Sequence, residues 1–216
     1  MMRVERVQSL GEEIANSVTH GVGALASVAA LPFLVVVALP GGVGSVVGNV
    51  VFGVSLVLLY TASTMYHSLA RNRAKRVFRI LDHSAIYVLI AGTYTPFTLG
   101  VLRGAWGWVL FGLVWALGVT GIALTASLGV RFPRASTAVY IAMGWLIIVA
   151  VKPLLASLPP AGLAWLVAGG VAYTGGVAFY GWGRLRYQHA VWHLFVLAGS
   201  VCHFVAVARY AAPHAA

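Results

Sequence analysis

Acidic residues are scarce in this 216-residue chain. There are four of them, Glu5, Glu12, Glu13 and Asp82, against 14 lysines and arginines. Asp82 is therefore the only carboxylate side chain after Glu13. Charged residues of either sign make up 8% of the chain, and hydrophobic residues make up 61%. Soluble domains carry about 25% charged residues, so this composition excludes an ordinary soluble domain and indicates a membrane protein.

Several other features are missing. The single cysteine, Cys202, excludes an internal disulfide. No internal repeat, low-complexity tract or second, soluble domain is recognisable. Glu12 and Glu13 precede the first apolar run, which argues against a cleaved signal peptide, because the n-region of such a peptide is basic. The net charge of +10 would suit nucleic acid, but the basic residues lie in short breaks between apolar runs. Orientation in a membrane explains them better, and no nucleic-acid partner is expected.

Apolar residues form seven runs of about 20 residues, the length of a helix that crosses a bilayer. The breaks between the runs contain Pro, Gly or charged residues. The sequence predicts an all-α integral membrane protein, a seven-transmembrane helix bundle, with an interfacial N-terminal segment over 1–19 and a tail over 212–216. The predicted spans are 20–39, 44–66, 80–100, 105–127, 137–157, 161–182 and 190–211.

Basic residues favour one side of this predicted bundle. The connections after the second, fourth and sixth spans contain Arg71, Arg73, Lys75, Arg76, Arg79, Arg131, Arg134, Arg184 and Arg186. The opposite side has Arg103, with Lys152 near the end of the fifth span. By the positive-inside rule, the N-terminus is predicted to be cytoplasmic. An odd number of spans then places the C-terminus outside.

This topology brings a few ionisable side chains to one membrane face. His67 ends the second span, Asp82 begins the third, and His189 and His193 begin the last. Three imidazoles and one carboxylate at one depth predict a metal site that keeps a position open for water.

His189 and His193 are four residues apart, so on a helix they share a face and suit one tetrahedral ion. His67 would supply the third ligand. The alternative is that these histidines only make hydrogen bonds between helices. Ser63 lies one turn deeper than His67, where it could orient that ring or the bound water. Equally, Ser63 could bond its own helix backbone.

Asp82 is expected either to bind the metal directly or to hold a metal-bound water. The water is favoured, because catalytic zinc sites use three protein ligands and a nearby carboxylate can accept the proton of the water. An ion pair with Arg79 or Arg76 is the alternative. His83 points about 100° away from Asp82 around a helix, and His203 lies about 15 Å deeper than His193. Both are expected to lie outside the site, with His203 as a polar residue of the bundle interior.

Four segments, Glu13 to Gly21, Ser63 to His67, Leu81 to Tyr87 and His189 to His193, resemble the hemolysin III family. This family is the bacterial branch of the progestin and adipoQ receptor superfamily. The resemblance implies that the three histidines of the SxxxH and HxxxH motifs bind Zn²⁺ and that the aspartate holds a zinc-bound water. Those roles fall on His67, His189, His193 and Asp82. It also implies a polar cluster of Glu13, Asn16 and His20, with a structural or a catalytic role, and a multi-pass location in the bacterial inner (plasma) membrane.

Three functions fit these expectations. The first is a zinc-dependent hydrolase of lipid amides or esters, since an open metal position beside a carboxylate suits attack on a carbonyl; the resemblance implies a ceramidase-like enzyme with Asp82 and Ser63 as catalytic residues. The second is a non-enzymatic membrane-homeostasis or sensor protein with structural zinc. The third is a pore-forming hemolysin that causes cytolysis, although the uniformly apolar spans lack the polar stripe of a channel. Imidazoles also suit other transition metals. Membrane lipids are the expected partners, and the oligomeric state is open.

Overall fold

The computed structural model describes residues 8–212, which are helical apart from short turns and contain no strand. The predicted all-α class is therefore confirmed. The elements are α1 (Leu10–Ala38), η1 (Leu39–Gly41), α2 (Gly42–Ser68), α3 (Arg73–Leu99), α4 (Ala105–Leu128), α5 (Pro133–Gly144), η2 (Leu146–Ala150), α6 (Val151–Ser157), α7 (Pro160–Tyr180) and α8 (Gln188–Tyr210).

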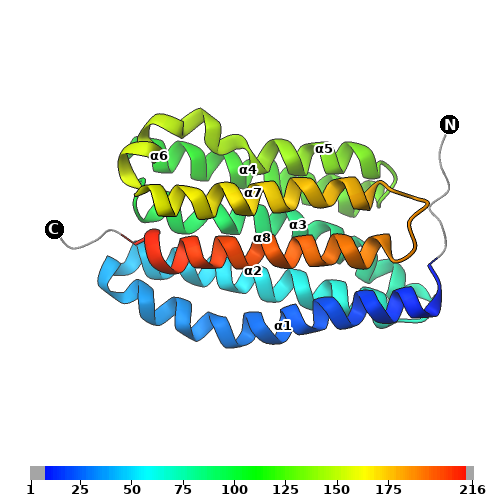
Figure 1. The fold of residues 1–216 in the computed structure, drawn as a ribbon. Helices are drawn as coiled ribbons and strands as arrows, with labels where there is room; N and C mark the ends of the chain where they lie inside the picture. The colour runs from blue at the N-terminus through cyan, green and yellow to red at the C-terminus, as the bar shows by residue number, and fades with distance from the viewer. Residues whose placement is uncertain (1–7, 213–216) are drawn as a thin grey trace.

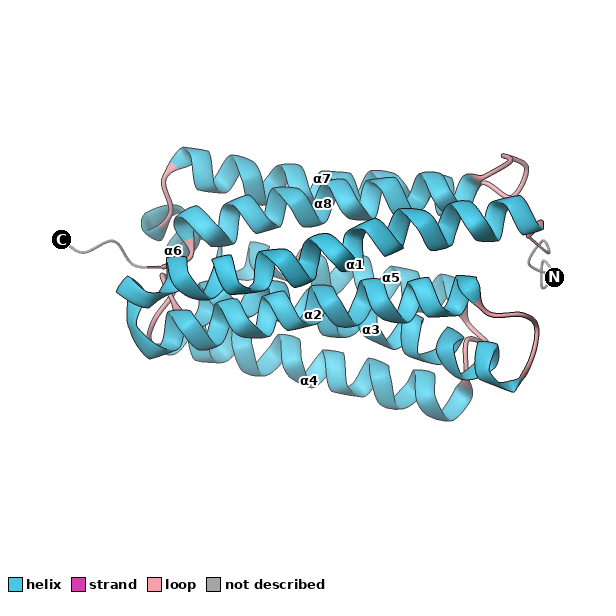
Figure 2. Cartoon of the chain, turned by 90° about the horizontal axis from the view of Figure 1, so that it is seen from below, coloured by secondary structure: helices cyan, strands magenta, loops and turns pink. Residues whose placement is uncertain are grey.

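The long helices lie side by side along one axis (Figures 1 and 2). Helices that follow one another in the chain are neighbours in space: α1 contacts α2, α2 contacts α3, α3 contacts α4, and α7 contacts α8. Helix α8 also packs against α1. The start of α1 and the end of α8 lie at opposite ends of the bundle (Figure 1). The start of α8 consequently lies beside the start of α1.

Helix α1 begins at a capping box. The Ser9 hydroxyl accepts a hydrogen bond from the Glu12 amide at 3.3 Å, and the Glu12 carboxylate accepts one from the Ser9 amide at 2.8 Å. The other Glu12 oxygen accepts from the amide of Tyr187 at 3.0 Å, just before α8. Glu12 therefore joins the first turns of α1 and α8.

Residues 10–19 of the predicted interfacial segment, 1–19, form the first turns of α1. Residues 1–7 of that segment, and residues 213–216 of the predicted tail, lie outside the described residues. The position of residues 10–19 at the membrane interface stays a prediction.

Five helical stretches within residues 8–212 are long and apolar enough to cross a membrane: 10–68, 105–128, 133–157, 160–180 and 188–210. Their apolar windows are at most 39% buried inside the protein. Large apolar side chains such as Leu25 and Val43 are instead 76% and 81% exposed on the outside of the bundle. Outward-facing apolar side chains are typical of a protein whose solvent is lipid.

The predicted fifth span, 137–157, is helical but broken. Helix α5 ends at Gly144, and five residues of 3₁₀-helix separate it from α6. The hydroxyl of Tyr94, from α3, lies 3.0 Å and 2.9 Å from the carbonyl oxygens of Met143 and Gly144 and accepts from the amide of Ile147 at 2.9 Å. A break in an apolar bundle needs such a partner, because unpaired backbone groups are costly there.

Small residues and polar side chains hold the bundle together. A Cβ on Gly48 of α2 would lie 2.6 Å from the Cα of Pro96 in α3, so only glycine allows these two helices to approach so closely. Between α2, α8 and α7, the hydroxyl of Ser200 lies 2.7 Å from that of Tyr60 and 2.8 Å from that of Tyr173. Close backbone contact and hydrogen bonds between helices replace the hydrophobic driving force, which is absent in lipid.

Candidate metal centre

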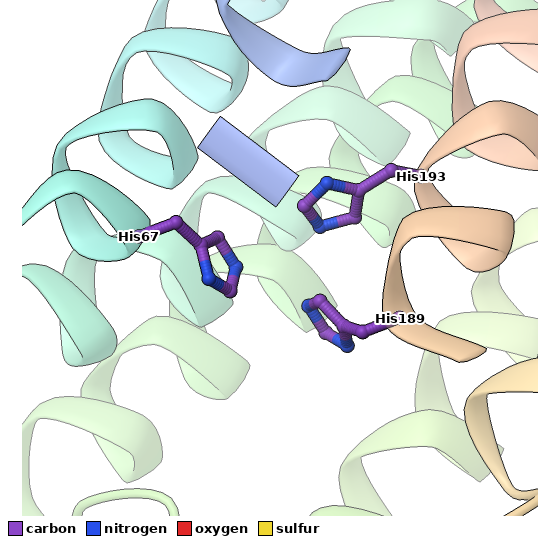
Figure 3. Close-up of side chains that lie close together, drawn as sticks. All are labelled: His67, His189 and His193. Carbon is purple, nitrogen blue, oxygen red and sulfur yellow. The ribbon is translucent and has the colours of Figure 1, made fainter. Parts of the chain in front are cut away.

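Three histidines lie close together where the C-terminal end of α2 is beside the N-terminal end of α8. His67 comes from the last turn of α2, and His189 and His193 come from the first two turns of α8. One ring nitrogen of each lies within 4.8 Å of the others. Figure 3 shows the three rings turned toward a common point. The HxxxH spacing places the rings of His189 and His193 on one helix face, with centroids 4.6 Å apart, as predicted.

The Nδ1 atom of His67 is held by Glu13, which also forms an ion pair with Lys75. Nδ1 of His67 donates to Oε2 of Glu13 at 2.7 Å, and Nζ of Lys75 donates to Oε1 of Glu13 at 2.8 Å. Nε2 of His67 is buried and has no hydrogen-bond partner among the described residues. A carboxylate that accepts from one imidazole nitrogen fixes the tautomer and increases the basicity of the other nitrogen. Nε2 is therefore the atom available to a metal ion.

His193 is oriented in a similar way by α1. Its Nδ1 donates to the carbonyl oxygen of Asn16 and to the hydroxyl of Thr19, both at 3.2 Å. The opposite nitrogen is left for the common point. His193 is buried, whereas His189 is partly exposed and packs its ring 5.9 Å from that of Tyr180. The donor set of three imidazoles, two of them held by hydrogen bonds, fits Zn²⁺ and related transition metals.

Asp82 and Ser63 lie beside this group rather than in it. Asp82 does not belong to the set of ligand atoms within 4.8 Å of one another, and both residues line the cavity described below. Asp82 is buried, and its carboxylate oxygen lies 3.7 Å from Nδ1 of His83. The buried hydroxyl of Ser63 lies near the Asp82 carboxylate and has no other hydrogen-bond partner among the described residues. Arg79 is also near Asp82, so the predicted ion-pair alternative stays open.

His83 and His203 lie outside the group of three, as expected. Nδ1 of His83 donates to the backbone carbonyl of Arg79 at 2.9 Å. Nε2 of His203 donates to the carbonyl of Leu166 on α7 at 3.2 Å. His203 thus serves packing between α7 and α8, in agreement with its predicted place in the bundle interior.

A cavity of about 220 Å³ extends from His189 and His193 into the bundle, and His67 does not line it. Its polar end includes His20, Ser63 and Asp82. Its walls are otherwise mostly apolar and include residues of α7 from Leu163 to Tyr180. These 17 helical steps correspond to a length of about 25 Å. The site therefore lies at one end of a long apolar chamber, the shape that suits a ligand with a polar head and a hydrocarbon chain.

The apolar exterior, the helical stretches and the histidine group define the class: a multi-pass integral membrane protein with a candidate metal centre. Comparison with known proteins supports this. A family described as "Haemolysin-III related" matches residues 8–204. Hemolysin-3 of Bacillus cereus is 50% identical over 209 residues, 96% of this chain and 95% of the relative. The Hemolysin-3 homolog of Bacillus subtilis is 49% identical over 203 residues, 94% of this chain and 95% of that relative.

The chain belongs to the haemolysin-III-related family. A more distant relative is the human monocyte to macrophage differentiation factor, 26% identical over 170 residues, 74% of this chain and 68% of the relative. That match supports the wider superfamily indicated by the four motifs. No solved structure matches the chain.

Sequence reasoning did not foresee the contacts that α1 makes around the site. The resemblance implies a polar cluster of Glu13, Asn16 and His20 but indicates no partner for any of them. In the structure Glu13 holds His67, the Asn16 carbonyl holds His193, and the His20 ring stacks on the His193 ring. Their spacing of three and four residues, which places them on one face of a helix, was the signal available.

Proposed function

We propose that this protein is a metal-dependent hydrolase of lipid amide or ester bonds, with Zn²⁺ as the metal. The observation that carries the proposal is that His189 and His193, which form a group with His67, line the polar end of a long, mostly apolar cavity. A catalytic zinc site has three protein ligands and an open position, whereas a structural site is closed by four. Only three ligand atoms converge within the described residues, which favours the catalytic type.

The chemistry follows from the residues around the group. A Zn²⁺ ion held there supplies Lewis acidity and activates water for attack on a carbonyl carbon. Asp82, buried at the same end of the cavity, would accept the proton of the attacking water and return it to the leaving group. The apolar walls would hold the hydrocarbon chain and exclude bulk water. Glu13 and the Asn16 carbonyl would keep the His67 and His193 rings in place.

The proposed topology is seven transmembrane helices. The apolar stretch of residues 10–68 has 59 residues, about three times the length that one crossing requires, and it consists of α1 and α2 joined by the short turn η1. Helix α3 is not among the five apolar stretches. It begins with basic residues, yet most of its second half is buried between neighbouring helices. Counting α1, α2 and α3 separately, and the broken 133–157 stretch once, gives seven crossings.

The proposed orientation places the metal group at the cytoplasmic face of the bacterial plasma membrane, with the N-terminus inside. A reporter fused after Ala216 is expected to give an extracytoplasmic signal, and one fused in the connection between α2 and α3 a cytoplasmic signal. Paired alkaline phosphatase and green fluorescent protein fusions in a bacterial host measure this. A cytoplasmic signal from the C-terminal fusion would overturn the topology.

Hydrolysis is tested most simply with the purified, zinc-loaded protein. It is expected to release free fatty acid from at least one member of a panel of long-chain amides and esters, and treatment with a chelator should stop the release. Mass spectrometry of the products measures both. If no lipid is cleaved, the hydrolase proposal is wrong and the sensor with structural zinc becomes the better account.

Two relatives carry the name Hemolysin-3, so a pore is the second candidate. A pore requires a continuous polar lining along the bundle axis. In residues 8–212 the cavity is lined mostly by apolar residues, and its ionisable side chains other than His203 and the tyrosines lie toward the end that holds His189 and His193. This distribution favours a lipid-binding chamber over a water-filled channel.

A further inference from the structure

His20 is a buried histidine whose ring nitrogens form no hydrogen bond within the described residues. Its side chain is 4% exposed, and neither ring nitrogen has a hydrogen-bond partner among the described residues. The ring lies flat against that of His193, with centroids 3.4 Å apart and planes 11° apart. The edge of the Tyr60 ring contacts it at 5.0 Å. Ring contacts therefore fix the imidazole in place without satisfying its polar atoms.

Such a group is unusual in a folded protein. A neutral imidazole has one N–H donor and one acceptor nitrogen, and burying both without partners costs free energy. His203, which lines the same cavity, satisfies one of its nitrogens with the Leu166 carbonyl. His20 satisfies neither. Its nitrogens are therefore available to a molecule from outside the chain.

The position of His20 indicates what kind of molecule could bind to its nitrogens. His20 and Ser63 both line the polar end of the cavity, next to His193 and Asp82. The hydroxyl of Ser63 is likewise buried, and the Asp82 carboxylate beside it is the polar group that it approaches. One side chain comes from α1 and the other from α2, so together they offer hydrogen-bond donors and acceptors from two sides of the chamber. Beyond them the walls are mostly apolar.

His20 does not fit the role of a fourth metal ligand. It is not part of the group whose nitrogens lie within 4.8 Å of one another. An ion bound in the plane of the His193 ring would lie about one ring separation, 3.4 Å, from the nearly parallel plane of His20. Zinc–nitrogen bonds are about 2.0–2.1 Å long. The stacked ring therefore supports His193 and keeps its own nitrogens for another partner.

We propose that His20 and Ser63 form the hydrogen-bonding site for the polar head group of a lipid whose chain fills the cavity. The head group must carry both an acceptor and a donor, because His20 presents one of each. This inference rests on the proposed lipid hydrolase function, and it assigns the substrate contact that the metal group and Asp82 do not supply. His20 would hold the carbonyl end of the lipid beside the metal group.

The test compares binding of two probes with the same chain length, a long-chain fatty amide and the corresponding alkane. Both displace a fluorescent fatty-chain probe from the full-length, zinc-loaded protein in detergent. The wild type is expected to prefer the amide. His20→Phe, which keeps a ring against His193 but has no nitrogen, should weaken amide binding by about ten-fold. Alkane binding and metal content should not change. His203→Phe is the matched control and should retain the amide preference.

Three results would overturn the proposal: no amide preference in the wild type, an undiminished preference in His20→Phe, or loss of the metal from that variant. Should His20→Phe fail to fold, Ser63→Ala provides the same comparison with a smaller change in volume. Because binding is measured without turnover, a protein that prefers the amide but cleaves no lipid would refute the hydrolase alone.

Discussion

Replacing Asp82 with asparagine is expected to abolish release of fatty acid while the metal stays bound. Asp82 is the only carboxylate after Glu13, and both oxygens of Glu13 are already held, by His67 and Lys75. The asparagine side chain has nearly the same shape, and Asp82 lies outside the group of three ligand nitrogens. Loss of a general base costs about 10²–10⁴-fold in rate.

The measurement is the rate of fatty acid release together with the zinc content of the same sample. Glu12→Gln is the matched control, because it also removes a buried carboxylate, one that caps α1 and holds the Tyr187 amide. That control should lower thermal stability while each folded, zinc-loaded molecule still turns over. Full activity in Asp82→Asn would eliminate the proposed role of this residue, and loss of zinc would make Asp82 a direct ligand.

His193→Ala is expected to remove the metal and to lower the thermal stability of the protein. His193 is buried and joins α8 to α1 through the Asn16 carbonyl. Its loss would therefore cost both a ligand and a contact between helices. Metal binding stabilises the folded state that contains the site, so a chelator should lower the melting temperature of the wild type but not that of the variant.

Differential scanning fluorimetry of both proteins, with and without chelator, measures this effect. His203→Ala is a useful comparison, since it removes the other histidine of α8 that packs between helices. That variant should lose stability but keep its response to the chelator. If the chelator has the same effect on His193→Ala as on the wild type, His193 does not hold the metal.

The meeting of His67, His189 and His193 could be predicted because it depends on helix ends alone. Antiparallel helices of one length bring the end of the second span and the start of the seventh to the same depth, whatever their rotation. The HxxxH spacing then fixes the relative direction of two of the rings. Both the depth of the three histidines and the spacing of the HxxxH pair can be determined from the sequence alone.

The contacts of Glu13 and His20 could not be predicted in the same way. Glu13 meets His67 across 54 residues of sequence, and the contact depends on how α1 is rotated about its own axis. The packing of α1 between α2 and α8 sets that rotation. Hydrophobic periodicity gives little guidance here, because α1 is apolar toward the lipid and polar side chains such as Asn16 and His20 face inward.

The helices also include one feature that the sequence signals locally and one that it does not. The start of α1 was present in the sequence as a capping box, Ser9 followed three residues later by Glu12, and reading it would have placed the helix start at residue 10. The break in the fifth span had no local signal of comparable strength. Its open backbone groups are satisfied by Tyr94, which lies about fifty residues earlier in the chain.

His67, His189 and His193 are expected to bind one metal ion. Metal analysis of the purified full-length protein tests this most directly, with the double variant His189→Ala/His193→Ala purified in parallel. The wild type is expected to contain one zinc per chain, with X-ray absorption giving nitrogen ligands at about 2.0–2.1 Å, and the double variant none. Equal metal content in the two proteins, or a wild type free of metal after purification in zinc-containing buffer, would contradict this account.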